Sequence, residues 1–453
     1  MRPRRWAIVA IAVTTAAIGT IATGCRHIGT DAQPASTTSG NPATDPNRAA
    51  AKLALAVTPE TGARNVAISG EIGLRLSGGR ITTVVLTRTG SSGRIKGSVR
   101  EDGTSWVPAV PLAFATRYTA TVTAVGLDGA QTATRTTTFT TMARPGRETG
   151  TGLYLFSDQV YGVAMPVVVE FSPPVPESAR AGVQRRLFVR SSPPQPGIWH
   201  WPSGSQVWYR PPTYWRPGTT LTVRAALAGH PTGNGYYGDV DRSATVRIGP
   251  KVLLDIDNKT KRASVYSGDK LIRTIPVSLG KRSTPSSSGH LVVMSKEYST
   301  IFDTTREGPG GYRVNINYAM RLTWGGEFMH AAPWSVGDQG VRNVSHGCVN
   351  MSWGSAEWLF GIAHVGDPVI VRGTEVHVTY GNGWTAWDIP WSQYIKGSAL
   401  PVPPELVTPG STAAAPSATA SPAAPPAPTP ATTAPPEAGA PASEPAAAAS
   451  PGG

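Results

Sequence analysis

The chain has 453 residues, a formal net charge of +13 and an ordinary hydrophobic content of 40%, but it is rich in glycine (50) and proline (42). It is too long for one hydrophobic core, so we expect two to four domains, with a composition that favours loop-rich β domains and disordered stretches. The positive charge favours anionic surfaces such as cell-wall polymers or lipid headgroups, whereas nucleic acid is excluded because no run of lysines and arginines is interleaved with aromatic residues.

Residues 1–24 are typical of an export signal. Met1–Arg5 is basic, an apolar run extends from Trp6 to about Ile21, and small residues precede Cys25. The run is shorter than the ~20 apolar residues of a membrane span, which argues against a spanning anchor. Because Ala22–Cys25 resembles a bacterial lipobox, we expect an exported protein, lipid-anchored at Cys25 on the outer face of the cell membrane and facing the periplasm or cell wall.

Residues 25–50 follow as a flexible tether, rich in Ser, Thr, Pro, Ala and Asn. Cleavage before Cys25 would remove three arginines (Arg2, Arg4 and Arg5) and no acidic residue, so the mature chain would keep a net charge of +10. The predicted lipid and the basic charge both direct the protein to a membrane or wall surface.

Two successive stretches, residues 51–143 and 144–249, are predicted to be β-sandwiches. Both contain short segments of period-two alternation, such as Tyr118–Val125 in the first and Thr220–Leu227 in the second. Turn residues separate these segments, for example Asp128–Gly129. Neither stretch carries a pattern that indicates catalysis.

Residues 250–373 predict a mixed β domain with one or two short helices, so that the whole chain is mainly β. One helix is expected from about Ser355 to Val365, with Glu357 in its first turn. Strands are predicted at Val252–Ile256, Arg262–Tyr266, Leu271–Ser278 and Pro368–Val371.

A tryptophan-rich C-terminal segment, residues 374–400, precedes a low-complexity tail. Its aromatic residues could stack on sugar rings, but packing against the domains is the commoner role of such a cluster. The cluster contains Trp384, Trp387, Trp391 and Tyr394. Residues 401–453 are rich in alanine, proline and threonine, which predicts a disordered, extended tail.

The chemistry of the chain is predicted to reside at Cys348. The chain has 2 cysteines, and the other, Cys25, belongs to the export segment, so Cys348 has no disulfide partner. A thiol close to His330 and His346 is typical of a nucleophile, because the thiolate needs a neighbouring base or positive field to form at neutral pH. An inert buried cysteine is the simpler alternative, and the flanking histidine and glycine argue against it.

Fourteen residues separate His330 from the run Ser345-His346-Gly347-Cys348-Val349-Asn350. This pattern resembles the signature of the L,D-transpeptidases of the YkuD family, and the surrounding residues resemble its actinobacterial, mycobacterial-type lipoproteins. The likeness extends over most of the mature chain, implying two immunoglobulin-like domains, a catalytic domain and the Trp-rich segment.

The resemblance implies a cysteine acyltransferase that acts on peptidoglycan. The thiolate would attack a tetrapeptide stem at the diaminopimelate–D-Ala bond and release D-Ala. The resulting thioester would pass to the diaminopimelate amine of a neighbouring stem, giving a 3→3 cross-link. Carbapenem-type β-lactams would act as covalent inhibitors.

The residues suit these roles. Cys348 would attack the carbonyl, His330 would take its proton and return one to the leaving amine, and His346 is counted with the catalytic group. Relatives orient the base with the backbone carbonyl of the following residue, here Ala331. The backbone amides of Gly347 and Cys348 are candidates for the oxyanion hole.

The resemblance also implies a donor pocket. Tyr312, eighteen positions before His330, corresponds to a tyrosine that lines it, and residues from about Tyr298 to Gly311 correspond to a lid whose glycines suit a hinge. The expected substrate-binding residues are Tyr312, Gly326, Ala331, Ser345, Gly347 and Asn350.

Three alternatives accompany this interpretation. His330, His346 and Cys348 could bind zinc, but no fourth ligand stands at a usual spacing, so neither a metal nor another cofactor is expected. The chain could instead be a non-catalytic wall-binding lipoprotein, against which the intact Cys–His pair argues. Water could also resolve the same thioester, which would make the protein an L,D-carboxypeptidase; the sequence does not separate transfer from hydrolysis.

Overall fold

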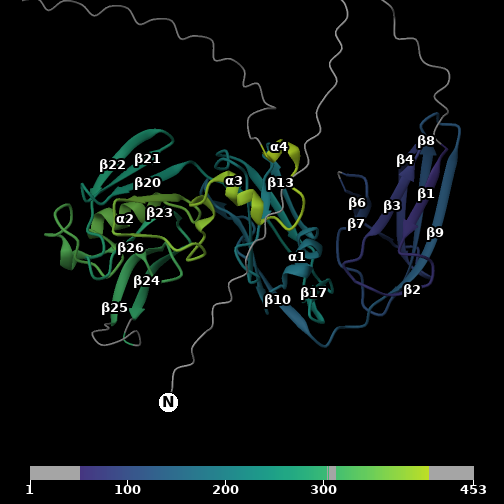
Figure 1. Cartoon of the computed structure of the whole chain (residues 1–453), viewed down its shortest axis with the longest axis horizontal. Coiled ribbons are helices and arrows are strands. Elements are labelled where there is room, and N and C mark those ends of the chain that lie inside the picture. Colours follow the sequence, from purple (N-terminus) through teal and green to yellow (C-terminus); the bar gives the residue numbers. More distant parts are fainter. Residues whose placement is uncertain (1–51, 101, 304, 306–312, 408–453) are drawn as a thin grey trace, which may run out of the picture. The chain divides into compact units, whose positions relative to one another are not determined.

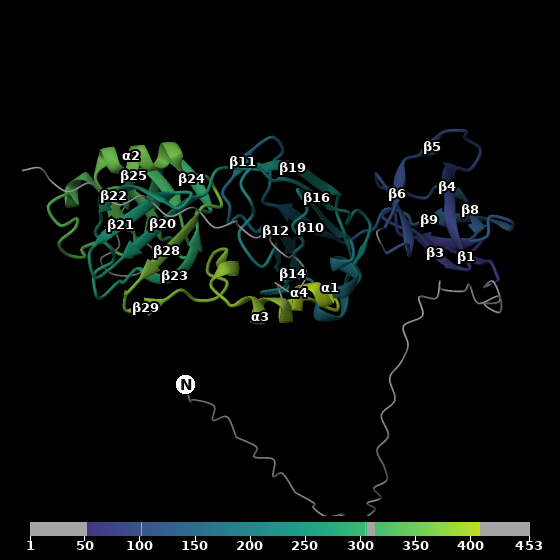
Figure 2. The same cartoon turned by 90° about the horizontal axis from the view of Figure 1, so that it is seen from above.

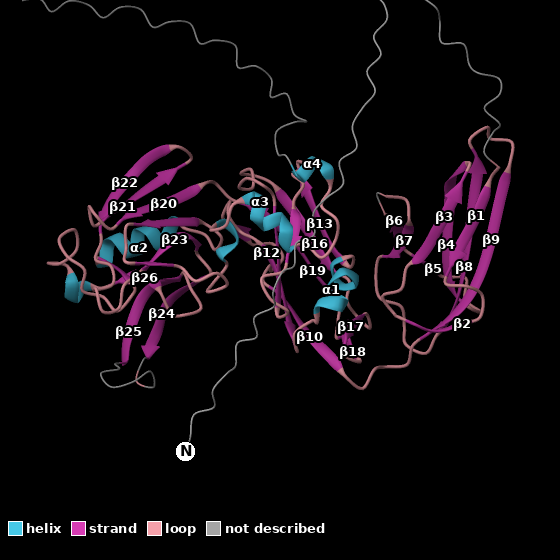
Figure 3. Ribbon diagram, in the orientation of Figure 1, coloured by secondary structure: helices cyan, strands magenta, loops and turns pink. Residues whose placement is uncertain are grey.

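The computed structural model describes residues 52–100, 102–303, 305 and 313–407 (Figure 1). The predicted export signal, Cys25, the tether, Tyr312 and the tail beyond residue 407 lie outside the described residues. The described chain is mainly β with a few short helices, which confirms the predicted fold class (Figures 2 and 3). Among the described helices, none combines the length and apolar character that crossing a membrane would require.

The first module is a sandwich of a four-stranded sheet, ordered β1-β3-β7-β6, and a five-stranded sheet, ordered β2-β9-β8-β4-β5. Strand alternation explains its core: Tyr118, Ala120, Val122 and Ala124 point inward from one strand and are each at most 2% exposed. The strands are β1 (Ala54–Thr58), β2 (Ala63–Val66), β3 (Ile72–Ser77), β4 (Gly79–Arg88), β5 (Arg94–Ile95), β6 (Gly97–Val99), β7 (Ser105–Pro108), β8 (Arg117–Gly126) and β9 (Thr132–Thr141).

The second module also has two sheets, ordered β14-β15-β12-β10-β18-β17 and β11-β19-β16-β13. It adds a short helix, α1 (Glu177–Gln184), that the sequence analysis did not predict; Pro176 occupies its N-cap without a side-chain hydrogen bond, so the usual start signal is missing. The strands are β10 (Glu148–Leu153), β11 (Val160–Tyr161), β12 (Val167–Ser172), β13 (Leu187–Ser192), β14 (Ile198–His200), β15 (Gln206–Arg210), β16 (Thr220–Ala225), β17 (Pro231–Gly233), β18 (Tyr236–Gly238) and β19 (Arg242–Ile248).

The third domain is built on a six-stranded sheet, ordered β22-β21-β20-β28-β23-β29, and a four-stranded sheet, ordered β24-β25-β26-β27. The two sheets share a core with helix α2 (Trp353–Ile362). The strands are β20 (Val252–Asp257), β21 (Arg262–Ser267), β22 (Lys270–Pro276), β23 (Ser287–Val292), β24 (Ser295–Asp303), β25 (Arg313–Arg321), β26 (Phe328–Ala331), β27 (Val349–Met351), β28 (Pro368–Arg372) and β29 (Val376–His377). A 3₁₀ turn, η1 (Pro333–Ser335), follows β26.

Helix α2 begins two residues earlier than the sequence predicted. The side chain of Ser352 caps it by accepting a hydrogen bond from the backbone N–H of Ser355 at 3.3 Å. Glu357 therefore lies beyond the first turn, where its carboxylate accepts a hydrogen bond from the hydroxyl of Tyr318 at 2.8 Å.

The C-terminal segment packs on the second module, and its ordered part extends past the predicted boundary at residue 400. Trp384 is 2% exposed and Tyr394 is fully buried, so neither ring offers a free face to a sugar. Leu406 joins the same core, so the prediction of disorder from residue 401 is wrong for residues 401–407. The segment contains η2 (Thr385–Trp387), α3 (Trp391–Tyr394), η3 (Ile395–Gly397) and α4 (Pro404–Val407).

Candidate active site

The pairing of two short strands brings the predicted nucleophile and base together. β26 and β27 run parallel, with His330 opposite Asn350 and Met329 opposite Val349. Because side chains alternate across a sheet, Met329 and Val349 enter the domain core, whereas His330 and Cys348 share the other face. The site therefore depends on strand register: a one-residue slip would send one of the two side chains to the opposite face.

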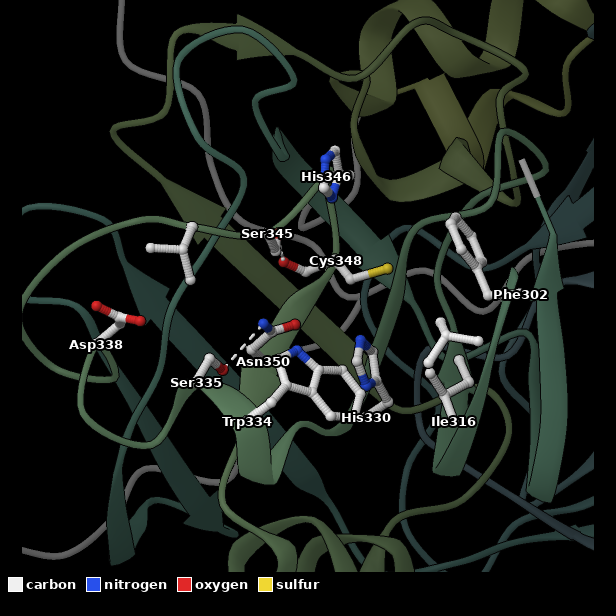
Figure 4. Close-up of a pocket in the computed structure, with 12 residues that line it drawn as sticks. Phe302, Ile316, His330, Trp334, Ser335, Asp338, Ser345, His346, Cys348 and Asn350 are labelled. Atoms are coloured by element: carbon white, nitrogen blue, oxygen red, sulfur yellow. Dashed lines mark hydrogen bonds between the residues drawn. The ribbon is translucent and has the colours of Figure 1, made fainter. Parts of the chain in front are cut away.

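His330 and Cys348 line one cavity of about 500 Å³. Figure 4 shows the side chains converging on it from β25, β26, η1 and the turn before β27. One wall is apolar, and the opposite rim is polar. The lining residues are Phe302, Val314, Ile316, His330, Trp334, Ser335, Asp338, Val344, Ser345, His346, Cys348 and Asn350.

The thiol of Cys348 is protonated in this resting structure. The residue is 6% exposed, and its sulfur lies 3.8 Å from the carbonyl oxygen of Gly326, to which the S–H donates. Burial raises the pKa of the thiol to about 12; the backbone amide of Phe328 opposes this rise, and the charge of Glu327 adds to it. Thiolate formation therefore requires a base in the cavity and a turn of the side chain away from Gly326.

His330 has the protonation state of a general base. Its Nδ1 lies 2.8 Å from the carbonyl oxygen of Ala331, and because a carbonyl can only accept, Nδ1 carries the proton and Nε2 presents a lone pair. The residue is 4% exposed, and this burial lowers the pKa of the imidazole, so the ring is neutral. Trp334 lies beside it, with ring centroids 6.0 Å apart.

Hydrogen bonds within the turn before β27 hold Cys348 in place. The hydroxyl of Ser345 donates to the carbonyl of Cys348 at 2.6 Å and accepts from the backbone N–H of Gly347 at 3.2 Å. Directly before β23, the hydroxyl of Ser286 donates to the carbonyl of Gly347 at 2.7 Å. Gly347 has φ +118°, a conformation that disfavours any side chain.

These bonds change the expected oxyanion hole. The N–H of Gly347 already has an acceptor in Ser345, whereas the N–H of Cys348 has none among the described residues. The amide of Cys348 is thus the donor that remains available to an oxyanion. Asn350 supports the site from behind, since its side-chain amide donates to the hydroxyl of Ser335 at 3.1 Å.

His346 lies on the cavity rim and is exposed. Its Nε2 lies 2.8 Å from the ammonium nitrogen of Lys281. Burial and the charge of Lys281 lower the pKa of His346, so this ring too is neutral. Its place at the rim, on the other side of Cys348 from His330, separates it from the proton transfer to the base (Figure 4).

The remaining predicted residues are placed only in part. Tyr312 and the hinge glycines of the predicted lid fall outside the described residues. The first part of the predicted lid lies at the end of β24, which pairs with β25 as far as Asp303 opposite Arg313. Phe302, on that strand, forms part of the apolar wall.

Two charged residues of the site were not predicted from the sequence: Glu327, whose charge acts on the thiol, and Lys281, which contacts His346. Glu327 stands three positions before His330, and its carboxylate accepts hydrogen bonds from the backbone N–H and the hydroxyl of Ser287 at 3.0 and 2.9 Å. Burial raises the pKa of Glu327. In the sequence, Glu327 could have been noticed as a charged residue directly before the strand Phe328–Ala331. No sequence feature indicates Lys281, because it reaches the site from a distant loop.

The described residues contain no group of three or more His, Cys, Asp and Glu side chains that could hold a metal ion. His330 and Cys348 instead contact backbone carbonyls, which suits proton transfer and nucleophilic attack.

Comparisons with known proteins match both kinds of domain. The bacterial Ig domain model matches residues 63–231, in a single match that spans parts of both sandwiches, and the L,D-transpeptidase catalytic domain model (YkuD) matches residues 251–371. L,D-transpeptidase 2 of Mycobacterium tuberculosis (strain CDC 1551 / Oshkosh) is 33% identical over 355 residues, which cover 77% of this chain and 85% of that protein. L,D-transpeptidase 5 of Mycobacterium tuberculosis (strain ATCC 25618 / H37Rv) is 33% identical over 376 residues, which cover 81% of this chain and 79% of that protein.

Among solved structures, an L,D-transpeptidase in complex with imipenem shares 31% sequence identity and covers 50% of this chain and 100% of its own, with a TM-score of 0.42. The identity to L,D-transpeptidase 2, extending over most of both chains, establishes the relationship. The chain belongs to the L,D-transpeptidase family.

Proposed function

We propose that the protein is a peptidoglycan L,D-transpeptidase that forms 3→3 cross-links between diaminopimelate residues through a thioester on Cys348. The observation that carries this proposal is the placement of His330 and Cys348 on one face of the β26–β27 pair, inside one cavity. Family membership supports the reaction class, because the chain covers most of the length of relatives named L,D-transpeptidases.

Acylation follows from the protonation states of the two side chains. The thiol proton moves to Nε2 of His330 as the sulfur attacks the carbonyl between diaminopimelate and D-Ala. The N–H of Cys348 stabilises the oxyanion. When the tetrahedral intermediate collapses, the C–N bond breaks, His330 returns the proton to the departing amine, and D-Ala leaves.

The second half-reaction reverses these roles. An uncharged diaminopimelate amine of a neighbouring stem attacks the thioester, the C–S bond breaks, and His330 takes the amine proton and returns it to the sulfur. Water in place of the amine would give a tripeptide, and the protein would then act as an L,D-carboxypeptidase. The experiment below separates these products.

Incubation of the purified protein with a tetrapeptide stem tests the proposal. Mass spectrometry should detect a covalent adduct on Cys348, free D-Ala and a cross-linked dimer. Tripeptide without dimer would favour the carboxypeptidase, and no adduct would favour a non-catalytic wall-binding protein.

Imipenem supplies an independent probe of the thiol, since a relative with 31% sequence identity has been solved in complex with it. We expect imipenem to acylate Cys348 and to add its mass to the intact protein.

The expected location is part of the proposal. We place the protein on the outer face of the cell membrane, anchored by a lipid on Cys25. The anionic wall and membrane would attract its net positive charge. Replacing Cys25 with alanine should release the protein from the membrane fraction, and metabolic labelling with a fatty acid should mark the native protein alone.

A further inference from the structure

Lys281 is built into the catalytic turn. Its backbone N–H donates to the carbonyl of Ser345 at 2.9 Å, and its own carbonyl accepts from the N–H of Thr284 at 2.8 Å. A β-bridge between Gly280 and Ser345 adds to this attachment. The lysine is half-buried, so its position is fixed relative to Cys348, three residues after Ser345.

The ammonium group of Lys281 reaches the rim of the Cys348 cavity. It lies 2.8 Å from Nε2 of His346, which lines the cavity. A lysine can only donate, so Nε2 of His346 is the acceptor and the histidine is neutral. The pair therefore keeps the full positive charge of the lysine at the rim.

No carboxylate in the described part of the chain lies within ion-pair distance of Lys281. By comparison, Lys251 pairs with Asp269 at 2.8 Å, and Lys296 donates to the carbonyls that end helix α2, those of Phe360 and Ala363. His346 occupies one of the three donors of the Lys281 ammonium, which leaves donors for an incoming anion.

The position of the lysine relative to the base identifies the part of the substrate that it faces. His330 must lie on the side of the leaving amine, because it protonates that nitrogen. His330 pairs with Asn350, and Asn350 follows Cys348 by two residues. His346, in contrast, precedes Cys348 by two residues. Figure 4 shows the two histidines on opposite sides of Cys348. Lys281 thus faces the acyl side of the scissile bond.

We infer that Lys281, held by His346, binds a carboxylate on the acyl side of the donor stem and makes the protein discriminate between free and amidated donors; this inference rests on the proposed function. Two groups could supply the anion, the second carboxylate of diaminopimelate and the free carboxylate of the preceding glutamate. An amide at the recognised position has lost the charge that the lysine pairs with, so it binds more weakly.

The test measures kcat/KM for acylation of Cys348 in the purified full chain, with synthetic tetrapeptide donors. One donor carries both free acyl-side carboxylates, two are singly amidated at either carboxylate, and a fourth carries a C-terminal D-Ala amide. For the wild-type protein we expect a loss of about tenfold to a hundredfold when the recognised carboxylate is amidated, the range of a charge-assisted hydrogen bond. The singly amidated donor that shows the loss identifies the carboxylate.

Lys281→Gln should reduce acylation by the free donor by a similar factor and leave acylation by the sensitive amidated donor unchanged. Lys281→Arg should restore most of the discrimination, because it keeps the charge. Arg282→Gln is the matched control: it removes the neighbouring exposed cation and should not alter the preference. Alkylation of Cys348 by iodoacetamide should proceed at the wild-type rate in Lys281→Gln.

Four results would overturn the inference. Equal losses for all four donors in Lys281→Gln, or a changed alkylation rate, would mean that the lysine supports the turn instead of binding substrate. A preference that depends only on the D-Ala carboxylate would place the anion on the leaving side. If no donor acylates the wild-type protein, the proposed function itself fails, and this inference with it.

Discussion

At the scale of single residues, the site is a neutral pair. The thiol of Cys348 has a pKa raised to about 12 by burial, and burial lowers the pKa of His330. Neither group is charged near neutral pH, so a thiolate–imidazolium pair does not form before substrate binds. In the proposed reaction the nucleophile forms only when the carbonyl arrives and the proton moves to His330, and a thiol that stays protonated until then is less open to oxidation.

The first prediction concerns this proton transfer. Cys348→Ala should abolish the imipenem adduct and the acylation by tetrapeptide, because the attacking atom is missing. His330→Ala should slow acylation by at least about a hundredfold, the usual contribution of a general base. Intact-mass measurement over time gives both rates. Wild-type turnover in either variant would contradict the mechanism.

The second prediction concerns Glu327, whose negative charge raises the pKa of the thiol. Glu327→Gln removes that charge, so the thiol pKa should fall and the thiolate fraction should rise at any pH below the midpoint. A fall of up to one unit corresponds to an increase of up to about tenfold in the alkylation rate of Cys348. The measurement is the rate of reaction with iodoacetamide between pH 7 and pH 10.

Asp338→Asn provides the control, since Asp338 also lines the cavity but pairs with Arg342 at 2.5 Å. Asp338→Asn should not change the dependence of the Cys348 alkylation rate on pH. An unchanged profile in Glu327→Gln would contradict a contribution of the Glu327 charge to the pKa of the thiol.

At the scale of elements, the sequence predicted those features that repeat along the chain. Strand alternation such as that of Tyr118–Ala124 identifies a sandwich. The helix near Ser355 was predicted with its start two residues too late and its end, expected at Val365, three residues too late. The motif around Cys348 predicted that this thiol and His330 lie together, without any knowledge of register, and the two line one cavity. What local sequence does not contain is the approach of distant loops, which brings Lys281 to His346 and Ser286 to Gly347.

The C-terminal segment shows the same limit. Its tryptophans predicted a cluster but not the cation at its centre. Arg210, from β15, donates to the carbonyls of Ala386 and Ile389 at 2.9 and 3.2 Å, and its guanidinium lies 4.2 Å from the ring centroid of Tyr394 and 4.3 Å from that of Trp387. Burial lowers the pKa of Arg210 to about 10.

The third prediction follows from that arrangement. Arg210→Met keeps much of the volume but removes the donors, so the buried carbonyl of Ala386 and the partly buried carbonyl of Ile389 lose their partner. Each unsatisfied group costs about 1–3 kcal/mol, so we expect the midpoint of thermal unfolding to fall by several degrees. Arg216→Met, at an exposed arginine of the same module, should leave the midpoint unchanged. An equal effect of both would argue against a specific attachment through Arg210.

At the scale of the whole molecule, the folded chain extends further than its composition suggests. Alanine and proline dominate from residue 401, yet Leu406 is 4% exposed in the core of the second module. The side-chain N–H of Trp391 donates to the carbonyl of Leu406 at 2.8 Å, so the last turn, α4, closes over the tryptophan cluster. Seven residues of apparent low complexity are therefore part of the fold.

Two truncated chains that differ by these seven residues distinguish the contribution of residues 401–407 from that of residues 408–453. A chain ending at Val407 should keep the wild-type acylation rate and unfolding midpoint, because every described contact remains. A chain ending at Leu400 loses the buried Leu406, worth about 1.5–3 kcal/mol, and the partner of Trp391. At roughly 2–4 °C per kcal/mol for a domain of this size, its midpoint should fall by several degrees. Identical midpoints would show that α4 contributes nothing to stability, and a loss of acylation on deleting only residues 408–453 would assign the tail a part in the chemistry.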